Sequence, residues 1–282
     1  MKRVLAVHDI SCFGKCSLTV ALPIISAAGI ETTVLPTAVL STHTGGFEGY
    51  TFRDLTDDVL PVVEHWQALG LRFDAIYTGF LGSFSQIDLV IELIERLRSE
   101  DTRIYVDPVM ADQGKLYGLF SADFPRGMAR LCALADVIIP NTTEAALLLG
   151  RPWTAPPYEE TQIRELCAAL TTELGAQATV LTGVAFDGAH LGAASYEAAT
   201  GHFSLAQEAR VPELYHGTGD VFGSVLVAAL VRGATLDAAT RVAARFTTQS
   251  IQRSFEAKTD NRYGVDFESG LATLSSLIES AR

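Results

Sequence analysis

The stretch AIYTGFLGSFSQIDLVIELIERLRSEDTRIYVDP, residues 75–108, carries the pattern that decides the fold class. Short apolar runs at Ala75–Tyr77 and Ile104–Val106 have the length and composition of buried strands. Between them, Asp88–Ser99 has leucines at every fourth position with charged residues off that row, which predicts an amphipathic helix. Because the helix connects two strands, we expect those strands to pair in parallel within one sheet.

The same alternation of strands and helices continues on both sides of this unit. Further apolar runs predict strands at Val4–Val7, Thr32–Leu35, Val137–Ile139 and Thr179–Leu181. More helices are predicted at Glu159–Leu174 and Val221–Val231. Ala189–Leu205 alternates weakly, which predicts a β-ribbon that turns at 198–201 and covers one face. We therefore expect a single α/β domain over residues 1–282, with a mostly parallel central sheet flanked by helices on both faces.

The composition is that of a folded protein and excludes several classes. Of 282 residues, 48% are hydrophobic and 19% charged, so a large core can form and general disorder is excluded. Asp and Glu total 33 against 21 Lys and Arg, a net charge of −12, which argues against a broad nucleic-acid surface. We expect no membrane span and no signal peptide, because no apolar run is long enough. The four cysteines are too few for a disulfide scaffold, so we expect a reducing cytoplasm.

Polar residues follow the predicted strands, and the carboxyl edge of a parallel sheet is where ligands bind. Asp9 and Ser11 come after the first strand, His43 and Thr44 after the second, and Phe80 after the third. A carboxylate, hydroxyls and an imidazole at this edge suit hydrogen bonds to a polar ligand. Helix capping and ordinary connecting loops use the same residue types, so both interpretations stay open.

The next strand ends carry groups that suit a metal ion. Asp107 places a carboxylate at the ligand edge, and carboxylates are ligands that Mg²⁺ prefers. Asn141 and Glu144 open an apolar helix, and their spacing fits a capping box. A capping role and a role in the site both remain open for this pair.

The most specific segment is His216-Gly-Thr-Gly-Asp-Val-Phe-Gly223, at the start of an apolar helix. Backbone N–H groups of Gly217, Thr218 and Gly219 converge in such a turn, and the helix dipole adds positive potential, which makes a site for an anion. Asp220 lies beside it, where a carboxylate repels phosphate unless it takes a proton from an attacking hydroxyl group. The spacings of a P-loop and of a dinucleotide-binding fingerprint are absent.

Taken together, these segments resemble the ribokinase superfamily of small-molecule kinases. Within it, the chain is most similar to the vitamin B6 kinases, above all to bacterial pyridoxamine/pyridoxal kinases, over nearly its whole length. The matching segments are His8-Asp9, Ser41-Thr-His-Thr-Gly45, Tyr77-Thr-Gly79, Asp107-Pro-Val-Met110, Asn141-Thr-Thr-Glu144 and Gly217-Thr-Gly-Asp220. The last three are specific to the superfamily, and the Ser-Thr-His-Thr-Gly loop indicates the B6 branch.

The resemblance implies an ATP-dependent kinase that phosphorylates the 5′-hydroxymethyl group of pyridoxal, pyridoxamine or pyridoxine in pyridoxal 5′-phosphate salvage. It implies that Asp220 is the catalytic base, that residues 217–219 form the anion hole for the γ-phosphate, and that Asp107 and Glu144 hold Mg²⁺. Implied nucleotide contacts come from Asn141, Glu144, Thr182, Gly183 and Asp112. Implied substrate contacts come from Asp9, Ser11, His43, Thr44 and Phe80. The resemblance also implies a monovalent cation such as K⁺ and a homodimer, with no nucleic-acid or membrane partner.

Two positions differ from the animal pyridoxal kinases. Asp9 stands where those enzymes carry Ser, and Phe80 stands where they carry Tyr, which leaves the preferred vitamer open. An acidic residue at position 9 also resembles the hydroxymethylpyrimidine kinases of thiamine synthesis. That activity, and a non-catalytic ligand-binding role on the same fold, are the alternatives.

Overall fold

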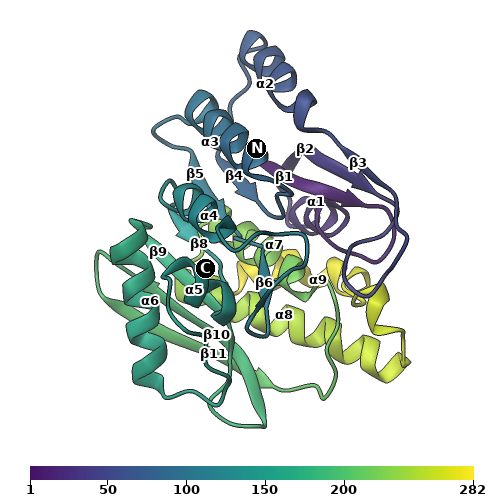
Figure 1. Cartoon of the computed structure of the whole chain (residues 1–282). Coiled ribbons are helices and arrows are strands. Elements are labelled where there is room, and N and C mark those ends of the chain that lie inside the picture. Colours follow the sequence, from purple (N-terminus) through teal and green to yellow (C-terminus); the bar gives the residue numbers. More distant parts are fainter.

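A nine-stranded sheet forms the centre of the molecule, which a computed structural model describes over residues 1–282 (Figure 1). The strand order is β11-β10-β9-β8-β5-β4-β1-β2-β3. The strands are β1 Arg3–Ser11, β2 Glu31–Leu40, β3 Phe52–Asp54, β4 Ala75–Thr78, β5 Arg103–Val106, β8 Val137–Ile138, β9 Ala178–Val184, β10 His190–Glu197 and β11 His202–Ala209. A separate hairpin pairs β6 Ala111–Asp112 with β7 Lys115–Leu116.

The central sheet is mostly parallel, as predicted. Strands β2, β1, β4, β5, β8 and β9 pair in parallel, whereas β3 at one edge and β10 and β11 at the other are antiparallel. The predicted ribbon forms as β10 and β11, but its predicted position over a face is wrong. Strand β10 pairs with β9 and extends the sheet at its edge. The prediction failed because weak alternation indicates two strands but does not specify which strand they pair with.

Helices cover both faces of the sheet, which confirms the predicted layers. One face is covered by α1 Leu18–Ala27, α7 Thr218–Val231, α8 Leu236–Ala257 and α9 Leu271–Glu279. The other face is covered by α2 Val59–Ala68, α3 Phe84–Leu97, α4 Phe124–Cys132, α5 Thr142–Leu148 and α6 Glu160–Leu174. The strands are apolar toward both layers, since Val4 packs into the first and Leu5 into the second. None of the helices has the length and apolar character needed to span a bilayer.

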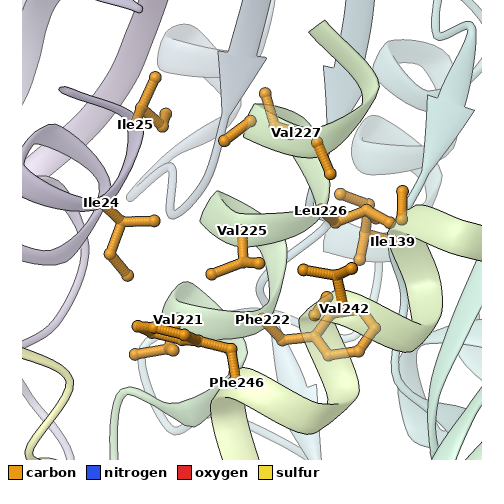
Figure 2. Packing of buried hydrophobic residues seen from close by; sticks show 14 of the residues in the cluster. Ile24, Ile25, Ile139, Val221, Phe222, Val225, Leu226, Val227, Val242 and Phe246 are labelled. Carbon is orange, nitrogen blue, oxygen red and sulfur yellow. The ribbon is translucent and has the colours of Figure 1, made fainter. Parts of the chain in front are cut away.

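Helix α7 is buried in the middle of the first layer. Figure 2 shows Val225 of α7 in the same apolar cluster as Ile24 of α1 and Val242 of α8. A helix that is apolar on nearly all sides is held by its neighbours along its whole length. This packing fixes the position of the first turn of α7, where the most specific sequence motif lies.

Strand β1 is longer than its apolar run predicts. It continues through His8, Asp9 and Ser11, with a shift in its register against β2 between His8 and Ile10. Irregularities of this kind redirect side chains and are common beside functional sites. Asp9 and Ser11 therefore lie in the carboxyl end of the strand and not in the loop after it, which corrects the prediction.

Candidate active site

A cleft of about 1510 Å³ is lined by residues at the carboxyl ends of the parallel strands. The loop after β2 and the first turn of α7 also line it. All residues proposed from the sequence line this cleft, namely Asp9, Ser11, His43, Thr44, Phe80, Asp107, Asp112, Asn141, Glu144, Thr182, Gly183, Gly217, Thr218, Gly219 and Asp220. The fold thus gathers them in one place, and the contacts of each side chain indicate what it can do there.

The turn before α7 has the features of an anion site. Gly217 has a φ of 75°, and a Cβ atom there would lie 2.2 Å from the carbonyl oxygen of Lys15, so only glycine fits. No side chain caps the start of this helix. The backbone N–H groups of its first turn therefore remain available, and the helix dipole adds positive potential at this end.

Asp220 lies half-buried in that first turn. Burial raises the pKa of its carboxyl group to about 7, although a hydrogen bond with the backbone of Ser17 lowers it, and the charge of Asp9 raises it further. A carboxyl group with a pKa near neutrality is suited to accept a proton from a substrate and to release it again.

Asp9 is 3% exposed and is partnered by Ser11, whose hydroxyl group donates to Oδ2 at 2.9 Å. Burial raises the pKa of Asp9, and hydrogen bonds with Ser17 and Ser11 lower it in part. Ser17, the residue before α1, makes no capping hydrogen bond with its side chain. The structure therefore gives Ser17 no capping role, and it places Asp9 in the floor of the cleft.

Asn141 and Glu144 form the predicted capping box at the start of α5. Glu144 Oε2 accepts from the backbone N–H of Asn141 at 2.8 Å, while Oε1 accepts from that of Met110 at 3.0 Å. Asn141 Nδ2 donates to the carbonyl oxygen of Ala111 at 2.7 Å. The pair therefore caps α5, which confirms the capping interpretation, and also holds the segment after β5 beside the cleft. Its role toward a ligand stays a prediction.

Carboxylates accumulate on this side of the cleft. Burial raises the pKa of Asp107 well above its usual range, and the charges of Glu144 and Asp220 add to this effect. Burial also raises the pKa of Glu144 to about 8 against its backbone hydrogen bonds. Arg210 is the only Lys or Arg that lines the cleft. Such a pair of repelling carboxylates is chemically suited to a hard divalent cation.

The carboxylates do not amount to a complete metal site made by the protein alone. No group of three or more His, Cys, Asp or Glu side chains is arranged to hold a metal ion. Asp107 and Glu144 therefore fit Mg²⁺ as partial ligands, in the way that Mg²⁺ is commonly held by one or two carboxylates together with phosphates and water.

His43 lies in the cleft wall, but the structure leaves it no free ring nitrogen. Its Nε2 lies 2.6 Å from the carbonyl oxygen of Arg262, and its Nδ1 accepts from the backbone N–H of Gly45 at 3.1 Å. The Nε2 contact joins the loop after β2 to the segment after α8, while the Nδ1 contact lies within that loop. In this arrangement neither ring nitrogen of His43 is free, so its contact with a substrate stays a prediction, whereas Thr44 beside it is exposed.

The other predicted residues complete the walls. Phe80 packs against a second phenylalanine ring with centres 5.7 Å apart, which gives an apolar surface suited to a flat ring. Thr182 and Gly183 lie near the end of β9, where Gly183 has a φ of 74°. Asp112 is exposed on the β6–β7 hairpin.

His216 also lines the cleft, although the sequence assigned it no role. Its ring lies 5.0 Å from that of His43, and no protein group hydrogen-bonds its nitrogens. The available signal was its position directly before Gly217, but nothing in the periodicity or spacing of the sequence gives a histidine at that position a role of its own.

Comparisons with known proteins identify the family. The sequence pattern of the phosphomethylpyrimidine kinases matches residues 22–264. The chain belongs to this family. A family member from Bacteroides thetaiotaomicron, assigned as a phosphomethylpyrimidine kinase and crystallised with pyridoxal, is 38% identical, with a TM-score of 0.92 over 97% of this chain and 95% of that one.

Pyridoxal kinases belong to the same group of relatives. The crystal structure of pyridoxal kinase from Lactobacillus plantarum is 32% identical, with a TM-score of 0.89 and coverage of 99% of both chains. The pyridoxine/pyridoxal/pyridoxamine kinase of Bordetella avium is 29% identical over 267 residues, which cover 88% of this chain and 84% of that protein. These similarities confirm the predicted ribokinase-like fold and the resemblance to vitamin B6 kinases.

Proposed function

We propose that this chain is an ATP-dependent kinase that phosphorylates the 5′-hydroxymethyl group of vitamin B6 vitamers. The observation that carries this proposal is the position of Asp220, a half-buried carboxyl group with a pKa near 7, in the uncapped first turn of α7. Phosphoryl transfer to an alcohol needs a base beside a site for the transferred phosphate. The relatives that bind or phosphorylate B6 vitamers support this choice of alcohol.

In the chemical step, the reacting groups come from the ligands, and the base and the anion site come from this turn. Asp220 accepts the proton of the 5′-hydroxyl group as its oxygen bonds to the γ-phosphorus of ATP. The bond between that phosphorus and the oxygen bridging to the β-phosphate breaks, and ADP leaves. The backbone N–H groups of residues 217–219 stabilise the charge on the transferred group, and the rigid packing of α7 holds them in place.

The remaining residues divide between the two ligands. We assign Asn141, Glu144, Thr182, Gly183 and Asp112 to the nucleotide side. We assign Asp9, Ser11, Thr44 and Phe80 to the vitamer side. Asp107 and Glu144 would hold Mg²⁺ together with the phosphates, and the ion would supply charge neutralisation there. A K⁺ requirement and a homodimer stay predictions. All four cysteines are free, in agreement with the proposed cytoplasmic setting.

A second candidate is phosphorylation of hydroxymethylpyrimidine. The description of the matched family favours it, and that substrate also presents a hydroxymethyl group on a flat heterocycle. The relative with pyridoxal in its crystal carries the same family description, so the description does not exclude B6 kinases.

A substrate panel tests the proposal. Purified protein is mixed with ATP and Mg²⁺, and ADP release is followed for pyridoxal, pyridoxamine, pyridoxine and hydroxymethylpyrimidine. We expect the highest kcat/KM with a B6 vitamer, and 5′-phosphorylated product by mass. A higher kcat/KM with hydroxymethylpyrimidine would select the second candidate, and no phosphorylation of any of the four would reject both.

A further inference from the structure

Two imidazole rings meet in the cleft, and only one of them has ring nitrogens without a protein partner. His43 and His216 lie with ring centres 5.0 Å apart and planes tilted by 38°. The nitrogens of His43 are both used, by Arg262 and Gly45. A neutral imidazole has one donor and one acceptor, so His43 has no capacity left.

His216 has the opposite arrangement. It is half-buried and lines the cleft, and none of the hydrogen bonds within the protein involves its ring nitrogens. Its backbone N–H donates to the carbonyl oxygen of Asn261 at 3.2 Å, which fixes its main chain. Burial and the neighbouring His43 lower the pKa of His216, against an opposite effect of Asp112, which favours the neutral form of the ring. It can therefore donate one hydrogen bond to a ligand and accept another.

The loop after β2 is shaped around this ring. A Cβ atom at Gly45 would lie 2.6 Å from both Cε1 and Nδ1 of His216, and one at Gly46 would lie 3.5 Å from Nε2. Gly45 has no positive φ, so its backbone does not require glycine. The space that Gly45 leaves is instead taken up by the imidazole. His216 is thus wedged between the substrate loop and the anion hole.

The structure of the vitamer ring limits which substituent the side chain of His216 can contact. Under the proposed function, on which this inference rests, the 5′-hydroxymethyl group lies at Asp220, four residues after His216. On one side of that group the ring carries only a hydrogen atom, and on the other it carries the 4-substituent. A hydrogen-bonding side chain next to the reacting group therefore meets the 4-substituent.

We propose that His216, and not His43, is the residue that recognises the 4-substituent of the substrate ring. The aldehyde of pyridoxal accepts from its N–H, the ammonium of pyridoxamine donates to its free nitrogen, and the hydroxyl group of pyridoxine can do either. The ring of His43 then packs against the ring of His216 and fixes its orientation.

The test compares pyridoxine with its analogue that carries a methyl group in place of the 4-hydroxymethyl group. We expect the wild type to prefer pyridoxine in kcat/KM by about three- to tenfold, the usual effect of one neutral hydrogen bond. In His216→Phe, which keeps a ring against His43 but has no nitrogen, that preference should vanish. His216→Gln, which restores a donor and an acceptor, should regain part of it.

Each outcome distinguishes the inference from the proposed function. If the preference persists in folded His216→Phe, or if the variant loses activity on both compounds equally, the inference is wrong while the kinase activity stands. If the wild type phosphorylates neither compound, the proposed function fails and the inference with it. Should His216→Phe not fold, His216→Ala gives the same comparison, and persistence of the preference there also overturns the inference.

Discussion

Glu144 Oε1 accepts the backbone N–H of Met110 at 3.0 Å, so one side chain both caps α5 and anchors the segment that follows β5. Its other oxygen accepts the backbone N–H of Asn141 at 2.8 Å. Glu144→Gln replaces one of these acceptors by an NH₂ group and leaves a buried N–H without a partner. We expect the free energy of unfolding to fall by about 1–3 kcal/mol, together with a higher Mg²⁺ requirement for activity.

Thermal melting and an Mg²⁺ activation curve on the same sample separate the two effects. Glu95→Gln, an exposed carboxylate on α3, is the matched control and should change neither. A lower melting temperature with an unchanged Mg²⁺ curve would leave Glu144 as a structural residue and remove it from the metal site.

Asp220→Asn tests the base. A positioned base typically contributes 10²–10⁴-fold, so we expect a loss of kcat of about that size with a folded protein. In the wild type, kcat should rise with pH through about 7 and then level off, because the ionised carboxylate is the active form. Near-normal kcat in the variant would reject Asp220 as the base.

The raised pKa of Asp220 also affects stability. Its folded-state value of about 7 lies above the ordinary value of 3.8, so between these two pH values the folded protein binds more protons than the unfolded chain. The Asp220 contribution to stability therefore falls as pH rises through this window. We expect Asp220→Asn to melt at a higher temperature than the wild type at pH 8, with the difference shrinking toward pH 4. The exposed Asp101→Asn is the control, and an equal difference at both pH values would contradict the raised pKa.

Gly217, in the turn before α7, cannot be replaced by a residue with a side chain without strain. Its φ of 75° and the carbonyl oxygen of Lys15, 2.2 Å from a built Cβ, combine backbone strain with a clash. We expect Gly217→Ala to destabilise the protein by more than about 2 kcal/mol and to lower kcat. Gly219→Ala has open space at its Cβ and should keep its melting temperature. Equal melting temperatures for the two variants would show that the turn relaxes without cost.

The layers of the fold and the location of the site can be predicted from the sequence, but the long-range contacts within the site cannot. The alternation of strands and helices predicts a parallel sheet, and the carboxyl-edge rule places the candidate residues in one cleft. The extent of β1 was missed because His8 and Asp9 end its apolar run while pairing with β2 continues. The hydrogen bond between His43 and the carbonyl oxygen of Arg262 could not be predicted, because Arg262 is 219 residues away along the chain. No local pattern encodes such a contact.

Asp9 and Asp220 are close enough in the cleft for the charge of Asp9 to raise the pKa of Asp220. Asp9→Asn removes that charge, so the pKa of the base should fall. We expect the rising limb of the kcat–pH profile to move to lower pH, by a shift that pH profiles of the two proteins measure directly. If Asp9 also holds the ring nitrogen or the 3-oxygen, which all vitamers share, kcat/KM should fall in parallel for pyridoxal, pyridoxamine and pyridoxine.

The parallel fall is the expected result, because His216 is available for the variable 4-substituent and Asp9 is then left to a common group. Ser11→Ala is the matched control for the hydrogen bond to Asp9, since it removes the donor at 2.9 Å and leaves the charge in place. It should leave the rising limb where it is, or move it slightly to lower pH, because loss of the donor raises the pKa of Asp9 and weakens its charge beside Asp220. A selective loss for pyridoxamine in Asp9→Asn would instead put Asp9 at the 4-substituent, because a charge-assisted hydrogen bond to the ammonium group is about twice as strong as a neutral one. An unchanged profile with unchanged kcat/KM for every vitamer would exclude Asp9 from both roles.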